Sequence, residues 1–400
     1  MKEIELSTMS TQECLDLQAF ESRHFTRVRH QAMEWATAWN LVLQFGLYQK
    51  GPDVSEVGST WLENLSDMRA LRPFSVSELY HMGGETAFIS NAWVQDTSTP
   101  AAYAAPRKVN SIPWTINTRV ILYRRDLLAK AGIEEKGAFA TADAMFETLV
   151  RLQESGAAPY PLSIATGGLS MHNIASWVWG RGGRFRSADY QRITLVEPEA
   201  RRGMQDFFRM HRFIAPQARG LLYTEAENYY FSGQAAVLFS GQWAMMMVKE
   251  HPDRVQKIVS ENTGYAVSPG VPFVGASHLV IWRHSLMETE ANQLIQHLTS
   301  PDVLLKFFRE IGNMPARMLA LNAEPFSSDP DYRMVSECIR KGRGFRSARL
   351  WAGVEARLNI LLSQLWKDLY ANPDLNLEVE IERRIRELAD RLERTLLANW

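Results

Sequence analysis

Residues 229–248 read Tyr229-Tyr-Phe-Ser-Gly-Gln-Ala-Ala-Val-Leu-Phe-Ser-Gly-Gln-Trp-Ala-Met-Met-Met-Val248. The beginning is typical of a helix end, with Gly233 as the stop residue. Ala235–Phe239 is an apolar run of strand length, the next Ser-Gly pair interrupts it, and Trp243–Val248 predicts the first turns of another helix. An aromatic residue between a strand end and a helix N-terminus lies where open α/β sheets bind ligands. Trp243 is therefore a candidate ligand-binding residue, and a buried Trp in an ordinary strand–turn–helix is the alternative.

A second segment reads Ile112-Pro-Trp-Thr-Ile-Asn-Thr-Arg-Val-Ile-Leu-Tyr-Arg-Arg-Asp-Leu-Leu-Ala-Lys-Ala-Gly-Ile133. Together with the Phe-x-x-Gly-x-Ala-Ala and Gly-x-Trp of the first segment, it resembles the family 1 extracellular solute-binding proteins. These are carbohydrate-type receptors of ABC importers, with the maltose-binding proteins as relatives. Three weaker matches occur in the family's order, so the resemblance covers nearly the whole chain: Gly51–Val54 before Trp61, Ala291–Pro301 and Gly312–Arg317.

The composition is that of an ordinary globular chain. Its 400 residues exceed what one hydrophobic core supports, so two lobes are expected. A net charge of −1 gives no electrostatic reason to expect a nucleic acid or an anionic membrane as partner. The only cysteines, Cys14 and Cys338, are too few for a metal site, and a single bridge between them stays open. We expect no metal and no cofactor.

The N-terminus leaves two alternatives for localisation. Met1-Lys-Glu-Ile-Glu-Leu-Ser-Thr8 enters directly into a predicted strand, without a basic and then apolar leader. Either a signal peptide and lipid anchor have been removed, or the protein stays in the cytoplasm. The resemblance favours removal and an extracytoplasmic location, because the family is normally exported.

The order of predicted elements indicates an α/β fold with a parallel sheet covered by helices. The predicted strands near the N-terminus are Ile4–Ser7, Arg29–Trp35 and Asp53–Val57, and the helices between them are Gln12–Phe25 and Asn40–Tyr48. Later predicted helices are Asp143–Ser155, His172–Trp179, Pro198–Arg212, Asp331–Lys341, Leu350–Tyr370 and Glu378–Leu397.

The resemblance implies the two-lobed, class II periplasmic-binding-protein-like fold, with hinged lobes and a ligand cleft between them. The implied division is residues 1–112 plus 267–312 for the N-terminal lobe and 113–266 plus 313–400 for the C-terminal lobe. The chain would cross near Pro113, Tyr265 and Pro315.

The last predicted helix carries one apolar stripe: Val379, Ile381, Ile385, Leu388, Leu392 and Leu396. The stripe is short for a coiled coil, so we expect the helix to dock on its own lobe and the protein to be a monomer.

Sugar recognition needs flat aromatic rings that stack on pyranose C–H faces, together with planar hydrogen-bonding groups for the hydroxyls. The resemblance places Trp243 on the family's stacking aromatic and Asn117 where maltose-type members have a ligand-binding carboxylate. It also selects, from loops that contact ligand in the family, Asp53, Trp61, Thr8, Met9, Gly275, Ser277 and Trp351. Three of these have competing structural roles: Asp53 as a turn or capping carboxylate, and Trp61 and Trp351 as core residues. Gly275–His278 is expected to be a glycine turn, and His278 alone suggests a structural histidine.

Arg340–Arg349 carries five positive charges in ten residues. It is either a solvated loop or, if Arg343, Arg346 and Arg349 face the cleft, a site for a ligand phosphate or carboxylate.

Enzyme signatures are absent from the sequence: no His-Glu-x-x-His, no phosphate-binding Gly-Lys loop and no Gly-x-Ser-x-Gly. Carboxylates such as Glu225 and Glu227 have no feature that singles them out for glycosidase chemistry. The sequence therefore predicts a receptor whose partners are a carbohydrate ligand and the permease subunits of an ABC transporter. The alternatives are a cytoplasmic solute sensor of the same fold, or a receptor for a sugar phosphate or another acidic ligand.

Overall fold

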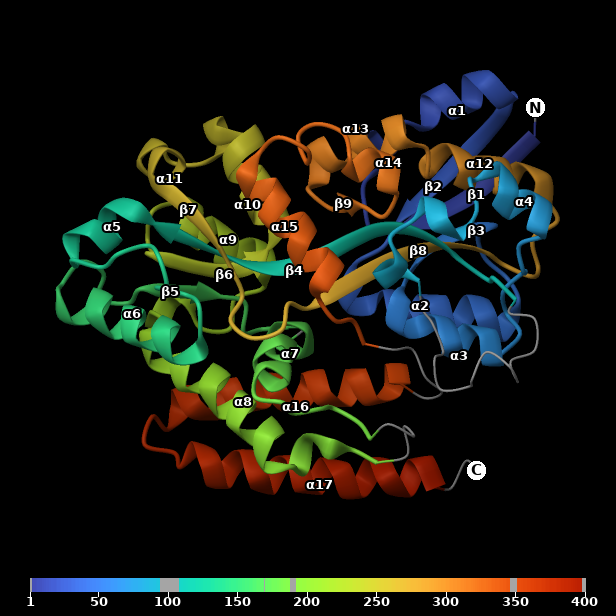
Figure 1. Ribbon diagram of the computed structural model, residues 1–400. Helices are drawn as coiled ribbons and strands as arrows, with labels where there is room; N and C mark the ends of the chain where they lie inside the picture. The colour runs from blue at the N-terminus through green and yellow to red at the C-terminus, as the bar shows by residue number, and fades with distance from the viewer. Residues whose placement is uncertain (1, 94–107, 169, 188–191, 346–350, 398–400) are drawn as a thin grey trace. The chain divides into compact units, whose positions relative to one another are not determined.

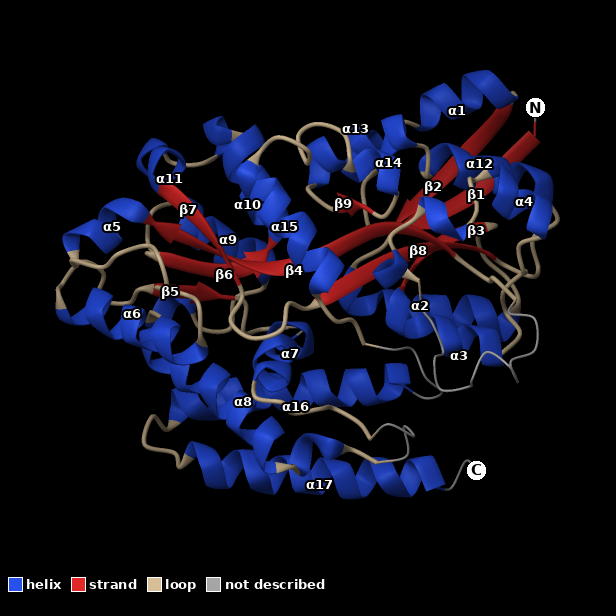
Figure 2. Cartoon of the chain, in the orientation of Figure 1, coloured by secondary structure: helices blue, strands red, loops and turns tan. Residues whose placement is uncertain are grey.

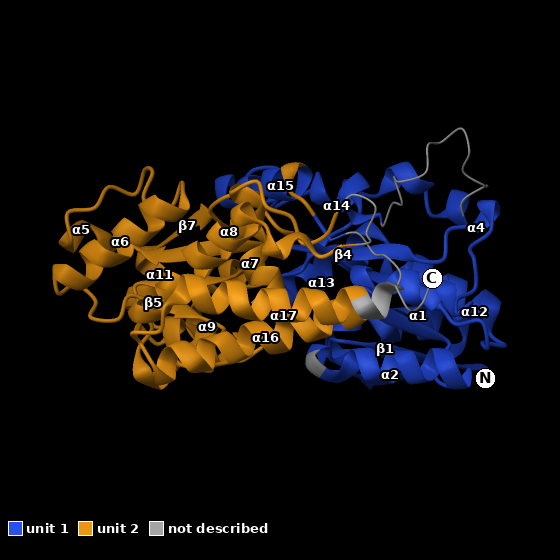
Figure 3. Ribbon diagram, turned by 90° about the horizontal axis from the view of Figure 1, so that it is seen from below, with its two compact units in different colours: residues 1–117, 274–340, 344–352 blue, residues 118–273, 341–343, 353–400 orange. Residues whose placement is uncertain are grey.

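The computed structural model describes residues 2–93, 108–168, 170–187, 192–345 and 351–397. Its fold is mixed α/β, with strands and helices alternating along the chain (Figures 1 and 2). The chain forms two compact units, coloured separately in Figure 3. Unit 1 contains residues 1–117, 274–340 and 344–352, and unit 2 contains residues 118–273, 341–343 and 353–400.

The sheet of unit 1 has the strand order β2-β1-β3-β8-β4. These strands are β1 (Lys2–Thr8), β2 (Thr26–Ala32), β3 (Val54–Gly58), β8 (Val274–Ile281) and the first half of β4 (Ile112–Arg124), on which the short β9 (Met314–Pro315) also pairs. β1 is parallel to β2 and to β3, which confirms the predicted parallel pattern, whereas β8 runs antiparallel to β3. The Nε1–H of Trp282 donates to the Oγ of Ser55 at 2.7 Å and ties the end of β8 to β3 across 227 residues of sequence.

Helices and one aromatic-rich core complete unit 1. The helices are α1 (Leu17–His24), α2 (Trp35–Tyr48), α3 (Leu62–Asp67), α4 (Val76–His81), α12 (Glu288–Leu298), α13 (Pro301–Ile311), α14 (Met318–Leu321) and α15 (Pro330–Lys341). The predicted helix 12–25 is interrupted at Asp16, whose φ of 50° lies in the left-handed region and separates a short 3₁₀ turn from α1. The core under α2 includes Val57, Trp61 and Trp282.

Unit 2 has a sheet of order β7-β4-β6-β5, formed by the second half of β4 with β5 (Leu162–Ile164), β6 (Val237–Gly241) and β7 (Thr263–Val267). The predicted helix stop at Gly233 is confirmed, with φ of 76°. The predicted strand end is wrong: Ser240 and Gly241 belong to β6. Ser240 is buried and hydrogen-bonded, and Gly241 pairs with Arg119 of β4, so both continue the ladder.

The helices of unit 2 are α5 (Arg125–Lys130), α6 (Ala142–Glu154), α7 (Ser170–Gly180), α8 (Pro198–Phe208), α9 (Tyr223–Phe231), α10 (Gln242–Glu250), α11 (Lys257–Asn262), α16 (Trp351–Ala371, beginning in unit 1) and α17 (Leu377–Leu397). α16 and α17 lie side by side (Figures 1 and 3). α17 docks on α8 of its own unit, as expected, and Arg201 of α8 pairs with Glu382. The stripe residues Ile381, Ile385, Leu388 and Leu392 are buried, but Val379 is 60% exposed because it lies in the first turn. The side chain of Leu396 lies outside the described residues.

The compact units differ from the predicted division at residues 113–117, 267–273, 313–340 and 344–352. Residues 313–340, which the prediction places in the C-terminal lobe, belong to unit 1 because β9 pairs with the unit 1 half of β4. Both Cys14 and Cys338 are free thiols. Among the described helices, none combines the length and the apolar character that a membrane span requires.

Candidate ligand-binding site

Trp243 lies in the first turn of α10, directly after β6, and its side chain is half-buried. Its Nε1–H donates to Oε1 of Glu227 at 2.6 Å. The indole ring occupies the space that a side chain on Gly241 would need, since an added Cβ would stand 2.1 Å from Cζ3 of the ring. A side chain at position 241 would therefore exclude the ring from this place.

Arg119 lies at the centre of an aromatic group in unit 2. It is only 4% exposed, and its register partner on β6 is Gly241. The guanidinium carbon lies 5.5 Å from the ring centroid of Tyr223, 5.2 Å from that of Trp243 and 5.3 Å from that of Phe273. These distances are within the range of cation–π attraction, so three rings stabilise one buried cation.

Asn173, from α7, orients two members of this group. Its Oδ1 accepts from Nε of Arg119 at 2.9 Å and from the hydroxyl of Tyr223 at 2.7 Å. Its Nδ2 is buried and has no hydrogen-bond partner in the described part of the chain. A buried donor without a partner is costly, so a ligand acceptor at this place would be stabilised.

Glu227, from α9, is the carboxylate of the cluster. The same oxygen that accepts from Trp243 also accepts from Oγ of Ser240 at 2.6 Å. Burial raises the pKa of Glu227, and the two donors and the charge of Arg119 oppose that rise. The carboxylate therefore holds the indole at a fixed angle.

We define the residues Arg119, Asn173, Tyr223, Glu227, Trp243 and Phe273 as the aromatic cluster; all belong to unit 2. It combines apolar ring faces with planar hydrogen-bonding groups, which is the chemistry that binds a molecule with apolar faces and many hydroxyls.

In unit 1, the predicted residues Met9 and Ser277 both interact with a buried carboxylate, Glu56. The main-chain N–H of Met9 donates to Oε2 of Glu56 at 2.7 Å. Burial raises the pKa of Glu56 to about 7, against the opposing hydrogen bonds from Met9 and Ser277. Thr8 is buried, and its hydroxyl lies 2.9 Å from Nε2 of His30.

Two predicted residues have structural roles. Asp53 accepts from the main-chain N–H of Glu5 at 2.9 Å and from Oγ of Ser285 at 2.6 Å, so it joins β1 to the segment that follows β8. Trp61 is 8% exposed within the unit 1 core. The ring centroid of Trp35 lies 5.7 Å from that of Trp61. Trp35 is 37% exposed, so Trp35, and not Trp61, is the accessible aromatic side chain of this pair.

The remaining predicted residues are dispersed. Gly275 lies within β8, so the expected glycine turn is wrong; residues 277–281 of the same strand pair with β3. Trp351 is 2% exposed and packs on Phe345. Asn117 is half-buried on β4, and Arg346 lies outside the described residues, as does Arg349.

Two further predicted residues are placed by their contacts. The predicted structural role of His278 is confirmed, since its ring lies 3.1 Å from Oγ of Ser111 and 2.9 Å from the carbonyl oxygen of Ala92. Arg343 lies 5.0 Å from the ring of Trp179.

Comparison with known proteins assigns the family. The family model described as bacterial extracellular solute-binding protein matches residues 17–334. This chain belongs to that family. No curated protein matches it by sequence.

Solved solute-binding proteins share the fold. An ABC transporter solute-binding protein from Thermotoga lettingae, bound with α-D-tagatose, has TM-score 0.81 and 18% identity over 99% of this chain and 100% of that one. The maltose-bound MalE3 of T. maritima has TM-score 0.81 and 17% identity over 97% and 99%. The sugar-binding protein MalE of Xanthomonas citri has TM-score 0.77 and 18% identity over 100% and 98%.

Most of the aromatic cluster of this solute-binding protein was not predicted from the sequence. Arg119 offered a usable signal, since a charged residue inside the apolar strand 112–123 must find partners when buried. Asn173, Tyr223 and Phe273 offered none. In the sequence, no feature distinguishes Glu227 from other carboxylates such as Glu225.

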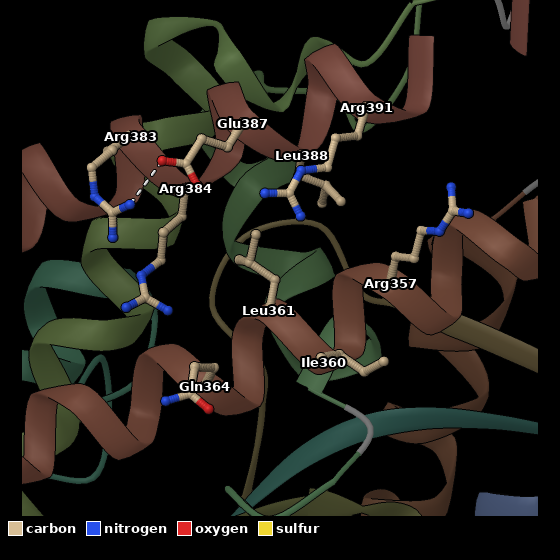
Figure 4. Close-up of a pocket in the computed structure, with 9 residues that line it drawn as sticks. All are labelled: Arg357, Ile360, Leu361, Gln364, Arg383, Arg384, Glu387, Leu388 and Arg391. Carbon is tan, nitrogen blue, oxygen red and sulfur yellow. Dashed lines mark hydrogen bonds and ion pairs between the residues drawn. The ribbon is translucent and has the colours of Figure 1, made fainter. Parts of the chain in front are cut away.

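A separate pocket of about 680 Å³ lies between α16 and α17 (Figure 4). It includes no residue of the aromatic cluster. Two of its arginines are matched by carboxylates: Arg383 pairs with Glu387 and Glu380, and Arg384 pairs with Glu380 and Asp368. Among the described residues, no group of three or more His, Cys, Asp or Glu side chains could hold a metal ion.

Proposed function

We propose that this solute-binding protein is the carbohydrate receptor of an ABC importer and that the aromatic cluster is its ligand platform. The observation that carries the proposal is the fixed Trp243 ring beside a buried Arg119 and the unpartnered Nδ2 of Asn173. The related structures bound with tagatose and maltose support a sugar or oligosaccharide as ligand.

The ligand would stack a sugar face on the half-buried indole, and its hydroxyls would hydrogen-bond to the guanidinium and amide groups. The carboxyl group of Glu227 interacts electrostatically with the guanidinium of Arg119. Because the protein itself supplies a partner for this positive charge, the site favours an uncharged ligand over an acidic one. Closure of two hinged lobes on the ligand, which the family resemblance implies, is part of the proposal. So are a permease as partner, a monomeric receptor and a location outside the cytoplasm.

A thermal-shift screen of mono-, di- and oligosaccharides, polyols and sugar phosphates tests the proposal. A ligand at 100 times its Kd stabilises the folded state by about 2.7 kcal/mol, which raises Tm by several degrees. Hits are then measured by calorimetry in the wild type and in Trp243→Ala. The absence of any rise in Tm with every sugar and polyol of the screen would overturn the carbohydrate assignment.

A further inference from the structure

Unit 1 contains a pocket of about 350 Å³ that shares no residue with the aromatic cluster. Three cations from three separate segments line it: Arg69 follows α3, Lys108 precedes β4 and Arg283 follows β8. All three side chains are exposed. We define these three residues as the cationic triad.

The charge of the cationic triad is not balanced by the described residues around it. No carboxylate lines the pocket, and no ion pair joins a triad residue to a carboxylate of the described chain. The neighbouring Arg72 shows the contrast, because it pairs with both Glu78 and Glu288. Like charges gathered around one concave surface attract an anion.

The main chain holds two of the triad residues in place. Arg69 has φ of 53°, and its N–H donates to the carbonyl of Ser66 at 2.8 Å, which fixes a tight turn. Arg283 is anchored twice: its N–H donates to the carbonyl of Ala70 at 2.8 Å, and Nη2 donates to the carbonyl of Leu71 at 3.3 Å. The main-chain positions from which the Arg69 and Arg283 side chains extend are therefore fixed before any ligand binds.

Two uncharged polar groups complete the lining. Nδ2 of Asn110 donates to Oγ of Ser66 at 3.2 Å. Because Ser66 Oγ accepts there, its own hydroxyl proton can donate to a bound group. Oδ1 of Asn110 is buried and without a partner among the described residues.

We propose that this pocket binds a phosphate group. Cations that converge from three segments suit a tetrahedral dianion better than a planar carboxylate, which one bidentate arginine satisfies. The volume exceeds that of phosphate alone and lies at the low end of the roughly 300–1,000 Å³ typical of small-molecule sites, so it has room for a small phosphate ester. The site is independent of the proposed sugar platform.

The test uses the full chain in phosphate-free buffer at constant ionic strength. Calorimetry measures the binding of inorganic phosphate and of glycerol 1-phosphate. The triple variant Arg69→Gln/Lys108→Gln/Arg283→Gln should bind at least tenfold more weakly than the wild type. The matched control Arg23→Gln/Arg27→Gln/Lys50→Gln removes the same charge from exposed positions of unit 1 and should bind normally.

Two further arms separate the sources of the phosphate group. Trp243→Ala should retain phosphate binding, which distinguishes this pocket from a sugar-phosphate site at the aromatic cluster. Flotation with phosphatidylglycerol vesicles, compared with phosphatidylcholine vesicles, tests a lipid headgroup; triad-dependent binding confined to these vesicles would assign the pocket to lipid phosphate. Absence of binding in every arm, or equal binding by the triple variant, would overturn the proposal.

Discussion

Trp243 and Glu227 are joined by a hydrogen bond of 2.6 Å between the indole Nε1 and the carboxylate Oε1. The same oxygen accepts a hydrogen bond from Oγ of Ser240. The buried Glu227 of α9 is therefore bonded both to the Trp243 ring on α10 and to the end of β6. The orientation of the indole therefore depends on three consecutive elements, α9, β6 and α10.

Trp243→Ala should weaken ligand binding by about 1–3 kcal/mol and change Tm little, because the ring is half-buried. Calorimetry and thermal melting measure the two effects. Trp61→Ala is the control, because loss of this core ring should lower the free energy of unfolding by about 3–5 kcal/mol. Early unfolding of the Trp243 variant with normal affinity would mean that this ring is a core residue.

Glu227→Gln should fold about as stably as the wild type but bind ligand several-fold more weakly, because one amide oxygen replaces a carboxylate that receives two donors. Glu227→Ala should also lose about 1–3 kcal/mol of stability, since it leaves both buried donors without an acceptor. Urea unfolding and calorimetry distinguish the variants. Wild-type affinity in Glu227→Ala would contradict a positioning role.

Gly241→Ala should displace the Trp243 ring, because the new Cβ would lie 2.1 Å from Cζ3. The φ of −86° at this position is accessible to alanine, so the main chain itself is not strained. We expect weaker ligand binding and a shifted tryptophan emission. Gly353→Ala, where no atom lies within 4 Å of the added Cβ, should leave both unchanged.

Glu56 should make stability depend on pH. Its pKa is raised from 4.5 to about 7 in the folded state, so the folded chain keeps a proton that the unfolded chain releases in this window. The free energy of unfolding should therefore decrease from about pH 4.5 to about pH 7, by at most about 3 kcal/mol from this group. Glu56→Gln should be less sensitive to pH over the same range in urea titrations. If the free energy of unfolding depended on pH in the same way in the wild type and in Glu56→Gln, the raised pKa of Glu56 would not be the cause.

Lobe closure predicts a smaller radius of gyration when the identified ligand is bound. Small-angle scattering with and without ligand measures this change. Identical curves at saturation would argue against a hinged receptor, and Trp243→Ala at the same ligand concentration serves as the unbound control.

Local signals predicted much of the fold. The strand–turn–helix at 235–248 was predicted because apolar runs and glycine stops act within a few residues. The strand end was placed two residues early because the partner of the Ser240 hydroxyl, Glu227, is 13 residues away on another element. The prediction of a turn at Gly275 failed for a similar reason, because β8, which contains Gly275, is held in the sheet by the long-range pairing of residues 277–281 with β3.

The candidate site was less predictable because its contacts are long-range. Arg119 donates hydrogen bonds to Asn173, which is 54 positions later in the sequence, and to Tyr223, which is 104 positions later. Trp243 was selected from the sequence because a family motif singles it out, and its role as a ligand platform stays a prediction. The family resemblance and the α/β fold were both confirmed by the family match and the related structures.

The hydrogen bond between Ser55 and Trp282 has a consequence for synthesis on the ribosome. The two residues are 227 positions apart, which at about 5–20 residues per second corresponds to roughly 10–45 seconds of translation. During that interval β3 of the nascent chain lacks β8, its antiparallel neighbour, and leaves one strand edge open to wrong pairing. The ribosome therefore completes residues 118–273 of unit 2 before the sheet of unit 1 can close.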